Sequence, residues 1–484
     1  MTKAMSRSGT ICSLALLALV GAAGCNMFDL SGPKLDENPN IQTEVRTPSQ
    51  YLPAILAAQA LFQEGGVART AGMWTQQFAG VDRQYASYDV YSVDEDAFST
   101  EWGLVYASGG LRDIRKFRAA AVALNDRQSA GISKVLEALT IGTAASVWGD
   151  IPYSEAADDA ILNPKLDKQL DVYAALQTLL TSGIADVSSG IGDGPGSSDL
   201  IYENDGALWA EAAHSLKARY YLNTAGVNAG AYALANAEAK LGISDQDHDF
   251  KFHHSGIATE WNVWMQFMYW DRDTYLRASA TLVDTLKNRN DPRIAGVVRA
   301  TMYPGATGGC TSGAEWCAPY FDTTATPSPP HGGIAGSHPG EFLGGASTLS
   351  EARLFGPNGD GGFFQPIITW AETQLIIAET AFRAGNTVEA LTAINAVRTA
   401  SDRTSLATVT LADIMTEKWI VMFQNIEVWS DWRRTCLPRL VPAPGKTAIP
   451  ERLVYPFAER NVNSNIPDPS AQPARNQANP VGCS

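Results

Sequence analysis

Three groups of aromatic, amide and guanidinium side chains are the residues whose types best suit ligand recognition. Flat rings offer apolar faces on which the carbon skeleton of a ligand can stack, and planar polar groups at the rim can hydrogen-bond to its polar groups. The first group contains Trp74, Gln76, Gln77, Arg83, Gln84, Tyr85, Tyr88 and Tyr91, the second Trp261, Trp264, Tyr269 and Trp270, and the third Trp316 and Tyr320.

The spacing of these groups separates core aromatics from exposed ones. Trp261, Trp264 and Met268 fall at helical spacing, which favours a buried stripe for the second group. The first and third groups have no such stripe, so ligand contacts are predicted there, with packing in the core as the alternative. The predicted contacts are Trp74, Arg83, Gln84, Tyr85, Tyr88, Trp316 and Tyr320.

Acidic residues and histidines give little support for a metal. Asp245, Asp247 and Asp249 begin like a calcium loop, but Phe250 stands where such a loop needs Gly and Gly256 where it needs Glu. Solvated acidic turns are the favoured interpretation of two further sets that could ligate calcium: Asp94-Glu95-Asp96, and Asp271 with Asp273. The histidines lack HExxH-like spacing. No metal and no cofactor is therefore predicted.

Catalytic patterns are also missing from the sequence. It contains no GxSxG elbow, no GxxxxGK loop and no reactive-cysteine signature. A glycosidase needs only two carboxylates that meet in space, which a sequence leaves open. The sequence patterns therefore give poor support for an enzyme.

The elements that must position these groups are mainly helices of period 3.6 between Gly-, Pro- and Asn-rich loops. The clearest pair has a stripe formed by Ala371, Leu375, Ala378 and Phe382, a stop at Gly385, and a cap formed by Asn386 and Glu389. Such a helix-turn-helix is of tetratricopeptide type and stacks on its neighbours. Further helices are expected over residues 135–147, 209–222 and 410–429.

A long irregular insertion, about residues 303–362, interrupts this helical pattern. It is rich in Gly, Pro, Ser and Thr, and it holds Trp316, Tyr320, Cys310 and Cys317. Loops of this length are uncommon unless they carry function or are disordered. A local disulfide between Cys310 and Cys317 would favour a functional loop over a disordered one.

The N-terminus has the order of an export signal. Lys3 and Arg7 precede an apolar run over residues 11–20, and small residues follow directly before Cys25. We predict removal of residues 1–24 and lipidation of Cys25, with a plain secretory signal or a retained short anchor as alternatives. Residues 25–50 then form a lipidated tether and residues 51–484 the body, in which no segment has the length and apolarity of a membrane helix.

Removal of the predicted leader changes the net charge of the chain and the set of cysteines that can form disulfides. The net charge is −15, and loss of Lys3 and Arg7 with the leader makes it −17, which disfavours nucleic acid as a partner. With Cys12 removed and Cys25 lipidated, four cysteines remain in an oxidising compartment, where an even set predicts disulfides. Of three pairings, Cys310 with Cys317 and Cys436 with Cys483 is preferred; four free thiols are the alternative.

Several strings along the chain resemble the SusD/RagB-like outer-membrane lipoproteins, in the order in which that family carries them. They are Asp36-Glu37-Asn38-Pro39-Asn40 after the lipid position, Trp148-Gly149-Asp150-Ile151-Pro152-Tyr153-Ser154-Glu155-Ala156, Leu216-Lys217-Ala218-Arg219, Ala378-Glu379 with Ile394-Asn395-Ala396-Val397-Arg398, and a tail with Glu417, Trp432-Arg433-Arg434, Arg452-Leu453-Val454-Tyr455-Pro456, Glu459 and Asn463. These motif residues are predicted to be structural. Trp148 is expected in the core, Asp150 as a turn cap, and Arg398 in an ion pair with Glu379.

The resemblance implies an all-α fold, a helical superhelix of tetratricopeptide-like pairs with long irregular loops. It also implies a cell-surface lipoprotein of the outer membrane that binds a nutrient, most often an oligosaccharide and less often a peptide, and passes it to a SusC-like TonB-dependent transporter. The ligand loops vary within the family, so no family contact residue is carried over. A tetratricopeptide-like scaffold for protein assembly and a glycoside hydrolase are the alternatives.

Overall fold

The computed structural model describes residues 46–267, 272, 275–294, 298–300, 337–340, 350–352 and 362–483. The chain divides into two units, Met1–Arg46 and Thr47–Ser484, and the elements below belong to the second. Outside the described residues lie the predicted leader, Cys25 and its tether, most of the insertion with Cys310, Trp316, Cys317 and Tyr320, and also Tyr269, Trp270, Asp271 and Asp273.

Helices make up most of this unit, as the sequence predicts. Those of eight residues or more are α2 (Pro48–Glu64), α3 (Gly66–Trp74), α5 (Ser99–Tyr106), α6 (Leu111–Ala123), α7 (Arg127–Trp148), α8 (Gln169–Val187), α9 (Gly206–Thr224), α10 (Ala231–Ala239), α12 (Ala280–Asn288), α14 (Trp370–Arg383), α15 (Thr387–Ala400), α16 (Leu411–Val421) and α17 (Glu427–Thr435). Shorter ones are α4 (Arg83–Asp89), α11 (Val263–Gln266) and α18 (Phe457–Arg460).

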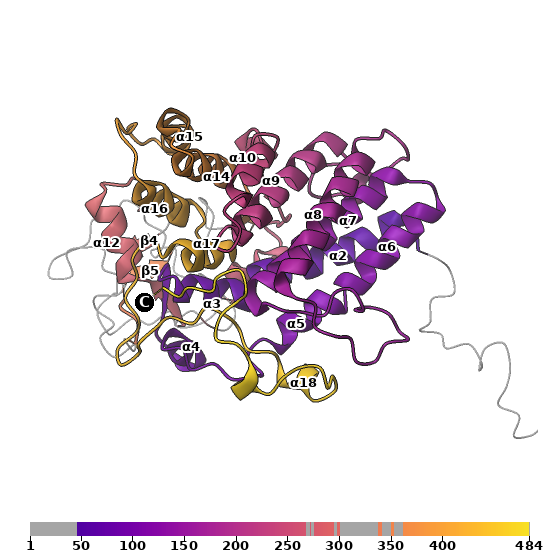
Figure 1. The fold of residues 1–484 in the computed structure, drawn as a ribbon, viewed down its shortest axis with the longest axis horizontal. Helices are drawn as coiled ribbons and strands as arrows, with labels where there is room; N and C mark the ends of the chain where they lie inside the picture. Colours follow the sequence, from indigo (N-terminus) through magenta and orange to yellow (C-terminus); the bar gives the residue numbers. More distant parts are fainter. Residues whose placement is uncertain are drawn as a thin grey trace, which may run out of the picture. The chain divides into compact units, whose positions relative to one another are not determined.

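The helices pack as successive pairs. Helix α6 contacts α7, α7 contacts α8, α8 contacts α9, α9 contacts α10, α10 contacts α14, and α14 contacts α15. Figure 1 shows these helices side by side, in this order, from indigo and purple through magenta to orange. Short loops join α6 to α7, α9 to α10 and α14 to α15, and helix pairs of this kind bury one another's apolar stripes as tetratricopeptide-like repeats do.

Local capping determines where these helices begin. The Asn386 side chain accepts a hydrogen bond from the Glu389 amide at the start of α15, and the Thr410 side chain accepts one from the Asp413 amide at the start of α16. Gly385, between α14 and α15, has a φ of +80°, which favours glycine. The sequence analysis predicted the cap of α15 and the stop at Gly385, and the structure confirms both.

The predicted single helix over residues 410–429 is wrong, because the chain breaks between α16 and α17. Gln424 has a φ of +73°, and its amide donates to Gln77 Oε1 at 3.2 Å. The Asn425 side chain then accepts from the Glu427 amide at 2.9 Å and starts α17. A contact from a residue far away in the sequence thus stabilises the turn that divides the helix.

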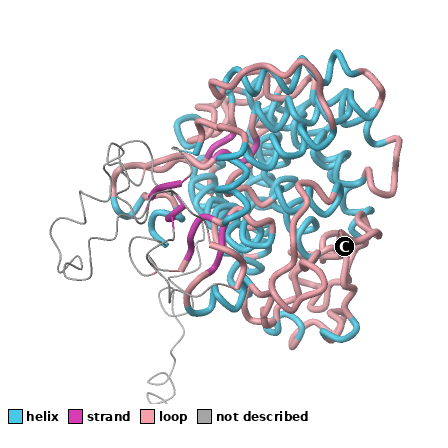
Figure 2. The backbone as a smooth tube through the Cα atoms, turned by 90° about the vertical axis from the view of Figure 1, so that its left-hand side faces the viewer, coloured by secondary structure: helices cyan, strands magenta, loops and turns pink. Residues whose placement is uncertain are grey.

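Three two-stranded antiparallel sheets lie along one side of the helices (Figure 2). They pair β1 with β3, β2 with β6, and β4 with β5. In the first, Phe78 faces Ala278, and in the last, Val298 faces Ala352. Because β4 and β5 flank residues 301–349, their pairing brings together the two ends of most of the insertion. The strands are β1 (Phe78–Gly80), β2 (Phe250–Lys251), β3 (Leu276–Ala278), β4 (Val298–Ala300), β5 (Ser350–Ala352) and β6 (Pro366–Ile368).

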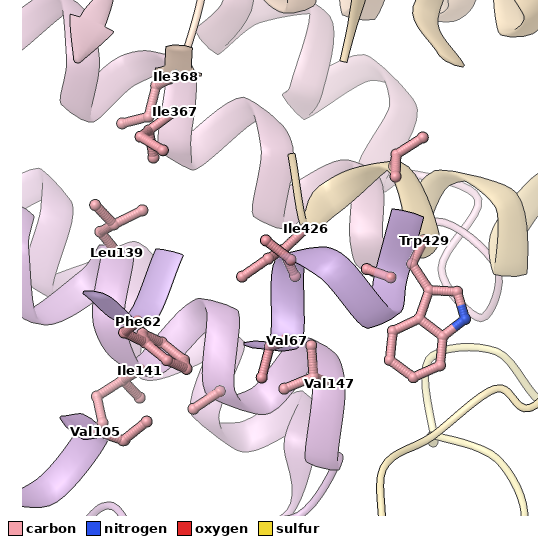
Figure 3. Packing of buried hydrophobic residues seen from close by; sticks show 14 of the residues in the cluster. Phe62, Val67, Val105, Leu139, Ile141, Val147, Ile367, Ile368, Ile426 and Trp429 are labelled. Atoms are coloured by element: carbon pink, nitrogen blue, oxygen red, sulfur yellow. The ribbon is translucent and has the colours of Figure 1, made fainter. Parts of the chain in front are cut away.

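A large apolar core holds the helices together. Trp148 is fully buried at the end of α7 and stacks on Phe62 of α2, with ring centres 6.3 Å apart. Figure 3 shows Phe62 and Ile141 near each other and Trp429 on the α17 side of the same cluster. Burial of side chains of this size stabilises the fold by about 1.5–3 kcal/mol each. The predicted structural role of Trp148 is confirmed.

Two further motif residues, Asp150 after α7 and Arg398 in α15, make structural contacts. Asp150 Oδ1 accepts from the Gln169 amide at 2.9 Å, so Asp150 caps the start of α8 as a turn residue should. The expected pair of Arg398 with Glu379 is wrong. Arg398 lies 3.4 Å from Glu417 instead, and Glu379 pairs with Arg434 and Arg383.

The C-terminal tail is fixed to α17. Cys436, the residue after α17, forms a disulfide with Cys483, which is the pairing that the sequence analysis preferred for these two residues. In the part of the chain that the structure describes, no helix has the length and apolarity needed to cross a bilayer.

Candidate functional site

Arg69 of α3 is the centre of a cluster that joins two distant parts of the chain. Its Nε donates to the Tyr85 hydroxyl at 2.7 Å, and its guanidinium carbon lies 4.0 Å from the ring centre of Phe267. The residue is 9 % exposed, and its Nη1 has no hydrogen-bond partner within the described residues. A guanidinium over a ring face is attracted by the electron density of the ring.

Aromatic rings continue from this guanidinium in a connected set. The ring centre of Tyr85 lies 5.1 Å from that of Phe267, 5.8 Å from that of Tyr275 and 5.5 Å from that of Tyr88. The guanidinium of Arg272 lies over Phe267, at 5.4 Å. The structure therefore brings Tyr85 of the first predicted group next to Phe267, which lies within the second group, and next to Tyr275, which follows it.

Trp74 and Tyr85 are core residues, which corrects their prediction as ligand contacts. Trp74 is 2 % exposed, its Nε1 donates to the Tyr88 carbonyl, and its ring lies 5.1 Å from that of Trp429. Tyr85 is 4 % exposed. Both belong to short helices, α3 and α4, whose apolar sides face the interior, and the sequence did not reveal these helices.

The neighbouring amides and Tyr91 also have structural roles. Gln77 is fully buried and its Nε2 donates to the Trp419 carbonyl at 2.7 Å, while Gln76 donates to the Val441 carbonyl. The Tyr91 hydroxyl accepts from the Ala443 amide at 2.9 Å, and burial raises the pKa of Tyr91 to about 12. These three side chains fix the tail and α16 to the first helices.

Arg83, Gln84 and Tyr88 form the surface of α4, which we call the α4 surface. Arg83 and Gln84 are exposed and Tyr88 is half-buried. Arg83 has a φ of +47°, a left-handed conformation that costs a non-glycine residue about 1–2 kcal/mol. Strain of this kind gathers at functional sites.

The insertion approaches the α4 surface. The Gly340 amide donates to Asp89 Oδ2 at 2.7 Å, and Ser337 exchanges backbone hydrogen bonds with Ala278 and Ala280 beside β3. Asp89 is the last residue of α4. The described part of the insertion thus lies against the helix that carries Arg83, Gln84 and Tyr88.

A second set of rings, which we call the exposed aromatic group, consists of His253, Trp261 and Phe364. Phe364 is 47 % exposed, and its ring centre lies 6.0 Å from that of His253. Trp261 is half-buried, and its Nε1 donates to the Gly256 carbonyl at 3.1 Å. Phe364 and His253 lie where the insertion rejoins the fold at β6, and Trp261 is joined to this point through Gly256, which lies next to Gly362.

Helical spacing correctly predicted the burial of Trp264 but wrongly included Trp261 in the same buried stripe. Trp264 is fully buried, as expected for a core stripe, and packs 4.9 Å from Phe78. Trp261 precedes the short helix α11 rather than lying within it, so it is not part of that stripe. Phe364 and His253 were missed, although the pair Phe363-Phe364 directly after the glycine-rich insertion was a visible signal.

One buried acid, Glu64, lies under the exposed aromatic group. Glu64 at the end of α2 accepts from His254 Nε2 at 2.8 Å and from Asn262 Nδ2 at 3.3 Å. Burial raises the pKa of Glu64, and the pairing with His254 opposes this rise. His254 and Asn262 flank the exposed residues of this loop, so the buried acid orients the loop from below.

Acidic residues do not gather into a metal site within the described ranges. Asp94 Oδ1 accepts from the Asp96 amide at 3.1 Å, and Glu95 pairs with Arg460 at 2.7 Å. This pairing lowers the pKa of Glu95. The acidic turn at residues 94–96 is therefore engaged within the protein itself.

Comparison with known families identifies the fold. A family model described as SusD-like, "Starch-binding associating with outer membrane", matches residues 40–397, and a second, described as "Susd and RagB outer membrane lipoprotein", matches residues 375–468. The chain belongs to the SusD-like family. Members of this family are carbohydrate-binding proteins without catalytic activity, and the family descriptions indicate the outer membrane.

Solved structures show the same SusD-like fold. A chitin-binding protein has 22% identity and a TM-score of 0.69, covering 86% of this chain and 94% of its own. A chitin-binding SusD homolog from Flavobacterium johnsoniae has 17% identity and a TM-score of 0.67, with 90% and 98% covered. A SusD/RagB family protein from Bacteroides thetaiotaomicron has 16% identity and a TM-score of 0.69, with 90% and 98% covered. No curated protein sequence matches the chain.

Proposed function

We propose that this SusD-like protein captures an oligosaccharide at the exposed aromatic group and the α4 surface. The observation that carries the proposal is the exposure of Phe364 beside His253 and Trp261, at the root of the insertion. Large rings left open to solvent in this way offer apolar faces to a sugar ring. Arg83 and Gln84 supply hydrogen-bond donors at the second surface.

The ligand class is supported by the family and by the structural relatives. The family description names starch, and two relatives of the same fold are named as chitin-binding. Both polymers consist of pyranose rings whose faces can stack on aromatic side chains. A peptide remains the second class, and a panel that contains both classes distinguishes them.

Delivery to a partner completes the proposal. The protein is held at the outer surface of the cell by lipid on Cys25, and it hands its ligand to a SusC-like TonB-dependent transporter. The support is the leader before Cys25 and the family description as outer-membrane lipoproteins. Residues 26–40, rich in polar and breaker residues, supply the tether.

Replacement of Cys25 tests the anchor. Cells fed a radioactive fatty acid are expected to label the wild-type protein and not Cys25→Ser, because a thioether-linked lipid needs the thiol. Cys436→Ser, which keeps Cys25, should label as the wild type does. Equal labelling of wild type and Cys25→Ser would show that the protein is not lipidated at this position.

Removal of the Phe364 ring tests the binding surface. Phe364→Ala is expected to weaken retention on the glycan that binds best in a panel of starch and chitin oligosaccharides by about 5- to 30-fold, because loss of one stacked ring costs about 1–2 kcal/mol. The measurement is affinity electrophoresis against the immobilised glycan.

A matched exposed phenylalanine provides the control. Phe457 in α18 is 46 % exposed, nearly the same as Phe364, but lies in the C-terminal tail. Phe457→Ala should leave retention unchanged. Equal losses in both variants, or none in either, would contradict the assignment of the site, and release of new reducing ends from a bound glycan would contradict a binding role without catalysis.

A further inference from the structure

A polar cavity of about 400 Å³ lies between the end of α7, the start of α8 and the C-terminal tail. Sites for small molecules measure about 300–1,000 Å³, so this cavity is large enough to admit a single sugar ring. None of its lining residues belongs to the α4 surface or the exposed aromatic group. The lining residues that matter for charge and shape are Asp150, Lys168, Arg452, Tyr455, Arg475 and Asn476.

The charges at this cavity do not balance. Lys168 pairs with Asp150 at 2.8 Å, and Arg475 lies 3.4 Å from Glu451. Within the described residues, Arg452 makes no ion pair, although it is only 8 % exposed. Three cations at the cavity, Lys168, Arg452 and Arg475, therefore stand against two acids, Asp150 and Glu451, in a chain whose net charge is −15.

Arg452 is held in place from three sides. Its Nε donates to the Trp148 carbonyl at 2.6 Å, its Nη1 donates to Gln472 Oε1 at 3.2 Å, and its guanidinium carbon lies 4.2 Å from the ring centre of Tyr455. Its Nη2 has no hydrogen-bond partner among the described residues. Burial lowers the pKa of Arg452, while the nearby charge of Asp150 opposes this shift.

Asn476 offers an unused acceptor beside this unused donor. Its Nδ2 donates to the Ser146 carbonyl at 2.6 Å, while its Oδ1 has no partner in the described structure. A Cβ on Gly149 would come within 2.6 Å of Asn476 Oδ1, and Gly149 has a φ of +81°, so glycine is needed for this close approach. A buried donor or acceptor without a partner costs about 1–3 kcal/mol, which a suitable ligand would recover.

We propose that this cavity binds a small monocarboxylate of hexuronate size, with the carboxylate beside Arg452, Lys168 and Arg475. One uncompensated positive charge matches one carboxylate, and a guanidinium presents planar donors that fit it. The Tyr455 ring offers a flat face to the carbon skeleton, and Asn476 can accept from a hydroxyl. The inference goes beyond the proposed oligosaccharide site and does not depend on it.

Calorimetric titration of the purified chain tests this site. Glucuronate is expected to bind at one site, at least about 10-fold more tightly than glucose, which has a hydroxymethyl group in place of the carboxylate. Lys168→Gln and Arg475→Gln, whose side chains are 63 % and 44 % exposed and so tolerate replacement, should each weaken glucuronate binding by about 2- to 5-fold.

Lys165 supplies the matched control. It is 57 % exposed and pairs with Glu155 close by in the sequence, but it does not line the cavity. Lys165→Gln should bind glucuronate as the wild type does. Equal binding of glucose and glucuronate would overturn the proposal. A loss of glucuronate binding in Lys165→Gln as large as that in Lys168→Gln would also overturn it. Unchanged glycan retention in Lys168→Gln would show that the two sites are separate.

Discussion

Glu379→Ala is expected to lower the free energy of unfolding by about 3–5 kcal/mol, because it leaves a buried arginine without its main partner. The Glu379 side chain is completely buried and the Arg434 side chain is 1 % exposed. Arg434 Nη2 donates to Glu379 Oε2 at 2.7 Å, and Arg383 Nε donates to Oε1 at 2.9 Å. Urea unfolding at pH 7, followed by far-ultraviolet circular dichroism, measures the loss.

The same residue predicts how stability depends on pH. The cations Arg434 and Arg383 outweigh burial and lower the pKa of Glu379 from 4.5 to about 2 in the folded protein. A depressed pKa adds stability above the unfolded value, and this contribution is lost as the pH falls from about 4.5 towards 2. The difference between wild type and Glu379→Ala should therefore shrink between pH 5 and pH 2.

An exposed ion pair is the control for this prediction. Asp159 pairs with Arg112 at 2.7 Å, but these side chains are 84 % and 51 % exposed. Asp159→Ala should change the free energy of unfolding by less than about 1 kcal/mol, because solvent screens such pairs. A loss in Glu379→Ala no larger than this would refute the structural role of the buried pair.

Replacement of both Cys436 and Cys483 by Ser is expected to cost about 4 kcal/mol. The disulfide closes a loop with a sequence separation of 47 residues, and a loop of this length restricts the unfolded chain strongly in the chain-entropy account. The bridge fixes the tail to α17, and the Cys483 amide also donates to Glu451 at 3.0 Å. Urea unfolding under non-reducing conditions provides the measurement.

Single variants separate the bridge from other effects of the thiols. Cys436→Ser and Cys483→Ser should each lose about as much stability as the double variant, because either change breaks the same bond. An unchanged urea midpoint in the double variant, or a loss confined to one single variant, would show that the bridge does not stabilise the fold.

Local signals in the sequence were sufficient to predict a mainly helical fold and the positions of several helices, among them α14 and α15. The cap of α15 depends on Asn386 and Glu389, three residues apart, and the stop before it depends on one glycine. Such interactions lie within a single turn, so the sequence alone contains them. The family strings added the expectation that Trp148 and Asp150 are structural.

Features set by distant contacts were not predictable in this way. The break after α16 depends on Gln77, and Glu379 pairs with Arg434 of α17 although α15, which carries Arg398, packs against α14. The burial of Trp74 and Tyr85 likewise depends on Trp429 and Phe267, which come from other segments. Exposure of a ring is a tertiary property, so an aromatic cluster in the sequence did not by itself locate the site.

Hydroxyl-radical footprinting with mass spectrometry tests the central claim most directly, because it reports which rings a bound glycan covers. With the best-binding oligosaccharide present, modification of Phe364 and Trp261 should fall, while that of Phe457, equally open in the free protein, should stay the same. Protection of Phe457 alone, or unchanged modification of Phe364 and Trp261 at saturating glycan, would contradict the assignment of the exposed aromatic group as the binding surface.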